Sequence, residues 1–144
     1  MTPGPSPDSA DLTLLHRRED VDRAVQAVLE ALSRHGYSES SRFAVRLAIE
    51  EALSNAFKHG HRGMPDSTHV RFAYAASPIQ LRITVEDQGP GFNPGTIPDP
   101  TLEENLETPS GRGLMLIRAY MTSVEFNPVG NRLTMIYRNP PAKG

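Results

Sequence analysis

Two polar residues, Glu51 and Asn55, stand one helical turn apart in a stretch that is otherwise largely apolar. Projected at about 100° per residue, they share an arc with four apolar side chains, Phe43, Ala44, Leu47 and Ala48. A carboxylate and a carboxamide are costly to bury without partners, so one interpretation is a polar pair satisfied by hydrogen bonds inside the core. The other interpretation is a site for a ligand or a metal ion.

The neighbouring Glu50 falls on another face of the same predicted helix, four positions after Arg46. Oppositely charged side chains at this spacing form ion pairs on solvated helix faces. We therefore expect a surface ion pair between Glu50 and Arg46.

A second feature is Asp87, which ends a predicted strand and precedes Gly89 and Gly91. Glycine and the intervening proline alone explain an ordinary turn at the end of a strand. A carboxylate fixed at this position can also accept a hydrogen bond from an exocyclic amine, while the glycines let a flat ring approach the backbone. Taken by itself, the motif leaves both interpretations open.

A third feature is the run Gly111, Arg112, Gly113 and Leu114, which opens a predicted helix. Unpaired backbone N–H groups and the helix dipole at such a start favour anions such as phosphate, although a flexible hinge has the same composition. The sequence has no GxxxxGK[ST] P-loop, and prolines follow the earlier glycines where a dinucleotide fingerprint requires a helix. Both common nucleotide-binding folds are therefore disfavoured.

The elements that position these residues follow from the apolar periodicity. Helices are expected at residues 20–35, 38–59 and 113–121, the second one capped by Ser38 and ended by a left-handed Gly60. Strands are expected at residues 12–15, 69–75, 80–86, 123–126 and 133–137. The proline-rich residues 89–110 are expected to form a lid or to be disordered. This order predicts an α+β sandwich with helices on one face of a sheet.

Length and composition narrow the classes of protein further. The 144 residues fit one domain, over residues 11–140, and the proline-rich residues 1–10 predict a disordered leader. Fifteen Lys and Arg against seventeen Asp and Glu leave a net charge of −2, so no direct nucleic-acid partner is expected. The absence of cysteine excludes disulfides and thiolate metal sites. No apolar stretch approaches the ~20 residues that cross a bilayer, so no membrane partner and a cytoplasmic location are expected.

Taken in chain order, the three features resemble the nucleotide-binding boxes of the GHKL ATPase superfamily, which includes gyrase, MutL and the histidine kinases. Within it, the chain resembles the short anti-sigma factor serine/threonine kinases. EEALSNAFKHG at residues 50–60 is similar to their N box, DQGPGF at 87–92 to their first glycine box, and GRGLMLIRAYM at 111–121 to their second. The resemblance implies the GHKL, or Bergerat, fold, which is a single-domain α/β sandwich with a mixed, mostly antiparallel sheet.

The resemblance also implies roles for individual residues. Asn55 would hold Mg²⁺ against the triphosphate of ATP through its side-chain oxygen, a hard ligand suited to magnesium. Glu51 would be the base that takes the proton from a serine or threonine hydroxyl of a partner protein. Asp87 would read the amino group of adenine, and Gly89 and Gly91 would shape the adenine pocket.

The second glycine box is implied to bind the phosphates. Gly111 and Gly113 would present backbone N–H groups to them, and Leu114 belongs to the same box. Secondary candidates for phosphate contact are three residues that can equally be solvated, Arg112, Lys58 and His59.

A zinc site is disfavoured, although His59, His61 and His69 lie close together in the sequence. The chain has neither an HExxH motif nor a cysteine to complete such a site.

The resemblance implies an ATP-dependent serine/threonine protein kinase that acts as an anti-sigma factor. It would phosphorylate an anti-anti-sigma partner with a STAS domain and sequester a sigma factor, and a homodimer is expected from the resemblance alone. Autophosphorylation of His16 is not expected, because 144 residues leave no room for the dimerisation helices of a sensor histidine kinase. Two alternatives remain, a non-catalytic ATP-sensing regulatory module and a weak ATPase in which Glu51 activates water.

Overall fold

The computed structural model describes residues 8–60, 63–65, 67–89 and 109–140, with the backbone alone for residues 59–60 and 109–114. The elements follow the chain in the order β1 (Ser9–Leu14), α1 (Arg18–Arg34), α2 (Glu39–Asn55), η1 (Ala56–Gly60), β2 (Val70–Ala76), β3 (Gln80–Glu86), α4 (Pro109–Tyr120), β4 (Ser123–Phe126) and β5 (Arg132–Arg138). η1 is a π-helical segment that continues α2 directly.

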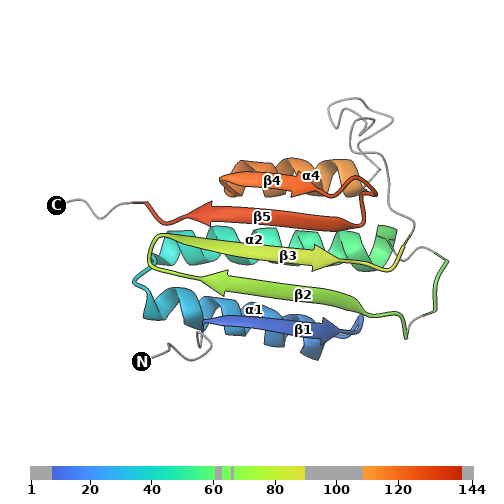
Figure 1. Cartoon of the computed structure of the whole chain (residues 1–144), viewed down its shortest axis with the longest axis horizontal. Coiled ribbons are helices and arrows are strands. Elements are labelled where there is room, and N and C mark those ends of the chain that lie inside the picture. Colours follow the sequence, from blue (N-terminus) through green and yellow to red (C-terminus); the bar gives the residue numbers. More distant parts are fainter. Residues whose placement is uncertain (1–7, 61–62, 66, 90–108, 141–144) are drawn as a thin grey trace.

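The strands form one five-stranded sheet in the order β1-β2-β3-β5-β4 (Figure 1). The sequence predicted a mixed, mostly antiparallel sheet, and every pairing between these strands is antiparallel. In the centre of the sheet, Ile83 of β3 pairs with Tyr74 of β2 and with Met135 of β5. β3 and β5 are therefore neighbours in space although α4 and β4 separate them along the chain.

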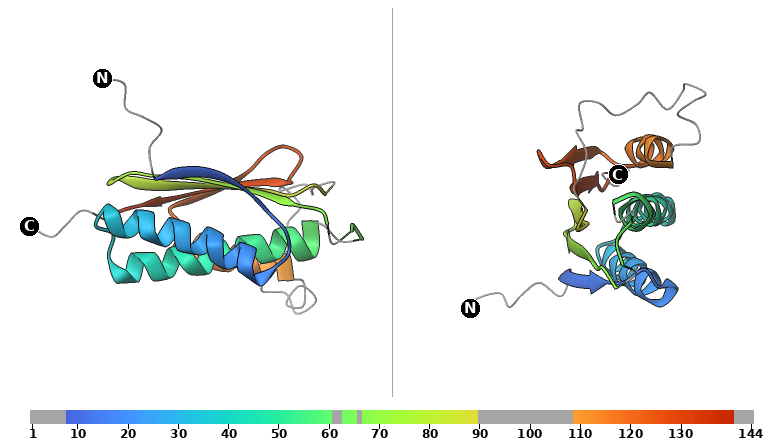
Figure 2. Two further views of the ribbon diagram at one scale, coloured as in Figure 1. Left: turned by 90° about the horizontal axis from the view of Figure 1, so that it is seen from below. Right: turned by 90° about the vertical axis from the view of Figure 1, so that its right-hand side faces the viewer.

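The helices α1, α2 and α4 all lie on one face of the sheet, as the right-hand view of Figure 2 shows. Alternate side chains of the central strands are buried beneath these helices, namely Val70, Phe72 and Tyr74 in β2 and Leu81, Ile83 and Val85 in β3. This alternation is the period-2 signal that predicted the strands, so the two-layer α+β sandwich is confirmed. Within the described residues, no helix combines the length and the apolar content that crossing a bilayer requires.

β1 begins earlier than the predicted strand. It starts at Ser9 instead of Leu12, and Asp8 before it is only 6% exposed. Arg34 Nε donates a hydrogen bond of 2.8 Å to Asp8 Oδ1, and His35 Nε2 lies 2.7 Å from Asp8 Oδ2. These contacts join the start of β1 to the end of α1, so the fold includes Asp8. Residues 1–7 of the expected leader lie outside the described residues.

The buried face of α2 differs from the predicted one. Phe43, which the prediction placed in the apolar arc, is 58% exposed. The apolar positions of α2 that are buried are Val45, Ala48, Ile49, Ala52 and Leu53. Because large branched side chains repeat here every four residues, this stripe covers more apolar area than the predicted one. Glu51 and Asn55 therefore border the buried face instead of lying within it.

The end of the second helix is also corrected. The prediction continued it to His59 and gave Gly60 a left-handed conformation, but the α-helix ends at Asn55 and Gly60 lies within η1. The glycine with positive φ that follows is Gly63, at 78°. A π-helical segment is wider than an α-helical one, so the helical path runs further before a glycine has to reverse it.

Candidate functional site

α2 carries Glu51 and Asn55 near its C-terminal end. The helix begins at the N-cap Ser38, whose Oγ accepts a hydrogen bond of 3.1 Å from the backbone N–H of Ser41, as the sequence predicted. Glu51 and Asn55 are both half-buried. Neither side chain forms a hydrogen bond or an ion pair with any residue that the structure describes. The interpretation as a satisfied core pair requires such partners, so the absence of partners in this part of the chain favours a ligand site.

Glu51 and Asn55 lie on the flank of α2 that faces α4. On the other flank, Arg46 Nε lies 3.1 Å from Glu50 Oε1 and both residues line a groove against α1. Asn55 follows Arg46 by nine positions, which at about 100° per residue places it on the opposite side of the helix. α4 packs against α2 on that side, because α2 lies between α1 and α4 in the helix layer (Figure 2).

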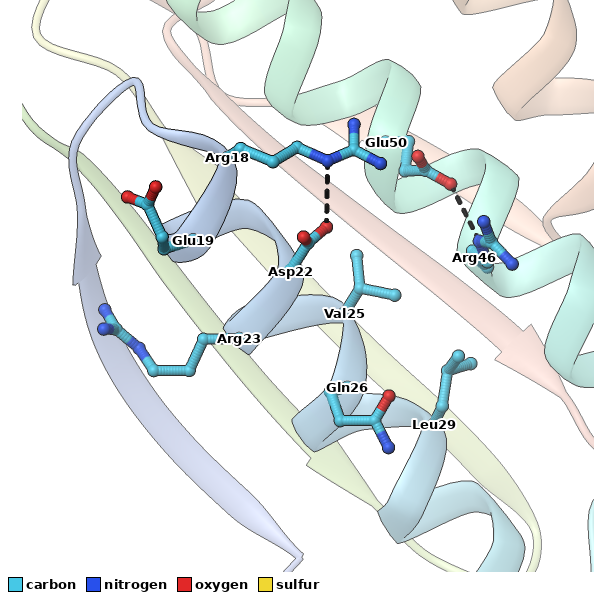
Figure 3. A pocket seen from close by; sticks show the side chains of 9 residues that line it. All are labelled: Arg18, Glu19, Asp22, Arg23, Val25, Gln26, Leu29, Arg46 and Glu50. Atoms are coloured by element: carbon cyan, nitrogen blue, oxygen red, sulfur yellow. Dashed lines mark hydrogen bonds and ion pairs between the residues drawn. The ribbon is translucent and has the colours of Figure 1, made fainter.

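The groove between α1 and α2 has a volume of about 570 Å³ and is lined by charges of both signs (Figure 3). Two ion pairs lie within its wall, Arg18 with Asp22 at 3.4 Å and Arg46 with Glu50 at 3.1 Å. The second pair is the surface ion pair that the sequence predicted. None of the predicted site residues lines this groove, so its position separates it from the features that predicted chemistry.

η1 continues the helical path past Asn55 and is joined to the connection between β1 and α1. The ring of His16 stacks on Phe57 of η1, with centroids 4.8 Å apart and planes inclined by 8°. Phe57 is buried beneath this contact, whereas Lys58 is exposed. π-helical segments are rare and occur frequently at functional sites. The side chain of His59 lies outside the described part of the chain.

Asp87 follows β3 directly and is half-buried. Its Oδ1 accepts a hydrogen bond of 2.8 Å from the backbone N–H of Gly89, which is an Asx turn. Burial raises the pKa of the Asp87 carboxyl, the bond from Gly89 acts in the opposite direction, and the charge of Glu86 raises this pKa further. Oδ2 has no partner among the described residues, so one carboxylate oxygen is fixed and the other stays available as an acceptor.

α4 begins at Pro109, before the predicted start at Gly113, so the glycine run 111–114 lies in its N-terminal part. Proline is favoured at the first helical position, because the N–H that it lacks has no partner within the helix there. The side chains of Arg112 and Leu114 lie outside the described part of the structure, as does the whole of Gly91 with residues 90–108 of the predicted lid.

The three sequence features come to one end of the sandwich. In Figure 1 the end of α2 with η1, the end of β3 and the start of α4 all lie at the same end of the molecule, and the left-hand view of Figure 2 agrees. Asn55, Asp87 and Gly111 are thus brought to one region from distant parts of the sequence. The described residues contain no group of three His, Cys, Asp or Glu that could hold a metal ion, and His61 lies outside them.

The sequence matches the family of the histidine kinase-like ATPase domain over residues 15–137, which is most of the chain. The chain belongs to the histidine kinase-like ATPase family. This membership confirms the resemblance to the GHKL superfamily and implies that the domain binds ATP and uses it as a kinase or as an ATPase. No curated protein matches the chain.

The fold of this histidine kinase-like ATPase domain is similar to that in a crystal structure of the RsbU and RsbW domains of Rv1364c from Mycobacterium tuberculosis. The two chains share 19% sequence identity and superpose with a TM-score of 0.62. The match covers 98% of this chain and 34% of the other, so this chain spans about a third of the length of that one. At this identity the likeness shows the fold alone.

The structure of this histidine kinase-like ATPase domain adds one residue to the candidate site that sequence reasoning missed. The backbone N–H of Asp87 donates a hydrogen bond of 2.9 Å to the carbonyl of Asn131, and Asn131 Nδ2 donates a longer one of 3.4 Å to the carbonyl of Asp87. The sequence NPVGN indicated only a turn between two strands. No local signal indicates that the strand after this turn pairs with β3, and so the contact was not predictable.

Proposed function

We propose that this domain is an ATP-dependent serine/threonine protein kinase that acts as an anti-sigma factor. It phosphorylates an anti-anti-sigma partner with a STAS domain and sequesters a sigma factor. The observation that carries the proposal is the pair Glu51 and Asn55, half-buried and without polar partners among the described residues, at the end of the sandwich where β3 ends and α4 starts. The three motif boxes and the RsbW domain named in the similar structure support the anti-sigma assignment.

Asn55 fits the role of a Mg²⁺ ligand. Magnesium prefers oxygen ligands and keeps several of its waters, so one or two protein oxygens suffice to hold it beside phosphates. The amide oxygen of Asn55 is half-buried and no described residue occupies it. It therefore binds the cation without first breaking a bond inside the protein.

Glu51 fits the role of the general base. Bound ATP supplies the phosphoryl group that is transferred. Glu51 accepts the proton of the serine or threonine hydroxyl that attacks, and its carboxylate is not held in an ion pair with any described residue. Its position one helical turn before Asn55, on the same flank of α2, places the base and the metal ligand side by side.

The remaining candidates surround the nucleotide. Asp87 accepts a hydrogen bond from the adenine amino group through Oδ2, and Gly89 and Gly91 shape the pocket for the ring. Backbone N–H groups of the second glycine box bind the phosphates, at Gly111, Gly113 and Leu114. Three basic residues add charge near the phosphates, namely Arg112, Lys58 and His59. The kinase domain occupies residues 11–140, forms a homodimer and works in the cytoplasm.

The direct test is phosphoryl transfer by the full chain. The protein is incubated with Mg²⁺ and γ-labelled ATP, alone and with purified STAS-domain proteins from the same organism. The proposal predicts label on a serine or threonine of one STAS-domain protein. Tight ATP binding with no turnover would instead identify a nucleotide-sensing module, and phosphate release without labelled protein would identify an ATPase. Either of these results would contradict the kinase assignment.

A further inference from the structure

The turn between β4 and β5 is held together by a single side chain. Asn127 Oδ1 accepts three backbone hydrogen bonds, from Gly130 at 2.8 Å and from Asn131 and Arg132 at 3.0 Å each. Asn127 Nδ2 donates to Asn131 Oδ1 over 2.8 Å, and Gly130 takes the positive φ of 87° that closes the turn. The amide of Asn131 is thereby fixed in one orientation, with its oxygen bonded and its Nδ2 directed away from the turn.

The same turn extends the ladder between β3 and β5 by one residue. The last register pair of the two strands is Glu86 with Arg132. Beyond it, Asp87 N–H bonds to the carbonyl of Asn131 at 2.9 Å, and Asn131 Nδ2 bonds to the carbonyl of Asp87 at 3.4 Å. Both main-chain polar groups of Asp87 therefore have a partner on Asn131, which fixes the peptide planes on either side of the Asp87 side chain.

We infer that Asn131, held by Asn127, is a positioning residue that fixes Asp87 for discrimination between purine bases by their exocyclic groups. The inference rests on the proposed function, in which Asp87 reads adenine. Oδ1 of Asp87 is bonded to Gly89 N–H at 2.8 Å, so Oδ2 is the oxygen that faces a base. A hydrogen-bond acceptor rejects a base with a carbonyl in place of an amine only while its position is fixed, because a mobile carboxylate rotates away from the repulsion.

The chain provides a matched control at the other end of β5. Asn139 follows β5 as Asn131 precedes it, and its Nδ2 donates a hydrogen bond of 3.0 Å to the carbonyl of Pro78. The backbone N–H of Asn139 also donates to the carbonyl of Ile79, at 2.9 Å. Asn139 thus ties β5 to the residues before β3 as Asn131 ties it to the residue after β3. Truncation of either asparagine removes one amide-to-carbonyl bond, but only Asn131 contacts Asp87.

The test compares the wild-type full chain with the variants Asn131→Ala and Asn139→Ala. Titration calorimetry with Mg·ATP and with Mg·GTP gives the ratio of the two dissociation constants for each protein. We expect the preference for ATP to fall by about tenfold in Asn131→Ala, since one modest hydrogen bond corresponds to a factor of this size. The ratio in Asn139→Ala stays at the wild-type value although its unfolding midpoint also falls. Amide hydrogen exchange without nucleotide becomes faster at Asp87 and Gly89 in Asn131→Ala only.

A second variant, Asn131→Asp, keeps the bond from Asn127 and replaces the donor to Asp87 with an acceptor. It therefore retains the turn and shows the same loss of base preference, even if the alanine variant does not fold. An unchanged ratio in both Asn131 variants, or an equal change in Asn139→Ala, would overturn the inference while leaving ATP binding intact. A wild-type chain that binds neither nucleotide would overturn the proposed function and this inference together.

Discussion

Glu50 and Glu51 are adjacent in α2 and differ in what surrounds them. Arg46 Nε donates a hydrogen bond of 3.1 Å to Glu50 Oε1, whereas Glu51 has no hydrogen bond or ion pair with any residue in the described part of the chain. One step along a helix turns the side chain by about 100°, so Glu50 lies on the flank toward α1 and Glu51 on the flank toward α4. The two residues form a natural pair for separating an effect of charge from an effect of chemistry.

Glu51→Gln removes the proposed base and keeps the size of the side chain. We expect phosphoryl transfer to a STAS-domain acceptor to fall by about 10²–10⁴-fold, the usual contribution of a positioned general base, while ATP affinity is retained. Glu50→Gln makes the same change in charge on the other flank and leaves transfer within a few-fold of wild type. Rates are measured with labelled ATP. Equal losses in the two variants would remove Glu51 from the role of base.

His16→Ala tests the contact that holds η1. The stack of His16 on Phe57 contributes about 0.5–1.5 kcal/mol beyond its buried area, so we expect a loss of stability of this order. Amide exchange is expected to quicken at residues 56–60, because the turn loses its tie to the start of α1. His69→Ala, at a histidine without an aromatic contact in the described residues, serves as the control. Unfolding in urea and hydrogen exchange make the measurement, and equal effects of the two substitutions would contradict a specific role for the stack.

Asp8 and Asp87 are predicted to affect stability with opposite dependence on pH. The hydrogen bond from Arg34, opposed by burial and reinforced by the bond from His35, lowers the pKa of Asp8 below its usual value, so its stabilising contribution is lost as pH falls through the lowered value. Burial chiefly raises the pKa of Asp87, so the folded state holds its proton more tightly than the unfolded chain does. Its contribution is present below the unfolded pKa of about 3.9 and is lost as pH rises through the raised value.

The measurement is urea unfolding of the wild type, Asp8→Asn and Asp87→Asn between about pH 3 and 7. The stability of the wild type relative to Asp8→Asn should increase with pH in this range. Its stability relative to Asp87→Asn should decrease with pH. Two differences that change with pH in the same direction would show that one of the two environments is described incorrectly.

Most of the fold was predictable because its signals are local. β3 and β4 have the predicted bounds, since alternating apolar residues between turn residues define them. Gly36 ends α1 as predicted and takes a φ of 78°, which glycine adopts without strain. The start of β1 was not predictable, because it depends on the contacts of Asp8 with Arg34 and His35 at the end of a later helix.

The candidate site was predictable in part. Motif spacing selected Glu51, Asn55 and Asp87, and the topology brings the elements that carry them to one end of the sandwich. The periodicity of α2 did not identify the buried face, because an apolar stripe containing Phe43 competes with the branched stripe that meets the sheet. The contact between Asn131 and Asp87 depends on the pairing of β5 with β3, for which a single sequence has no signal.

Calorimetric titration of Mg·ATP into the wild type and Asn55→Ala tests the central claim most directly, with Asn139→Ala as the control for loss of an asparagine side chain. The account predicts that the wild type binds ATP more tightly with Mg²⁺ than with EDTA, and that Asn139→Ala does the same. It predicts that Asn55→Ala loses this enhancement and binds Mg·ATP at least tenfold more weakly, a change of about 1.4 kcal/mol. An absence of binding by the wild type, or an undiminished magnesium effect in Asn55→Ala, would contradict the account.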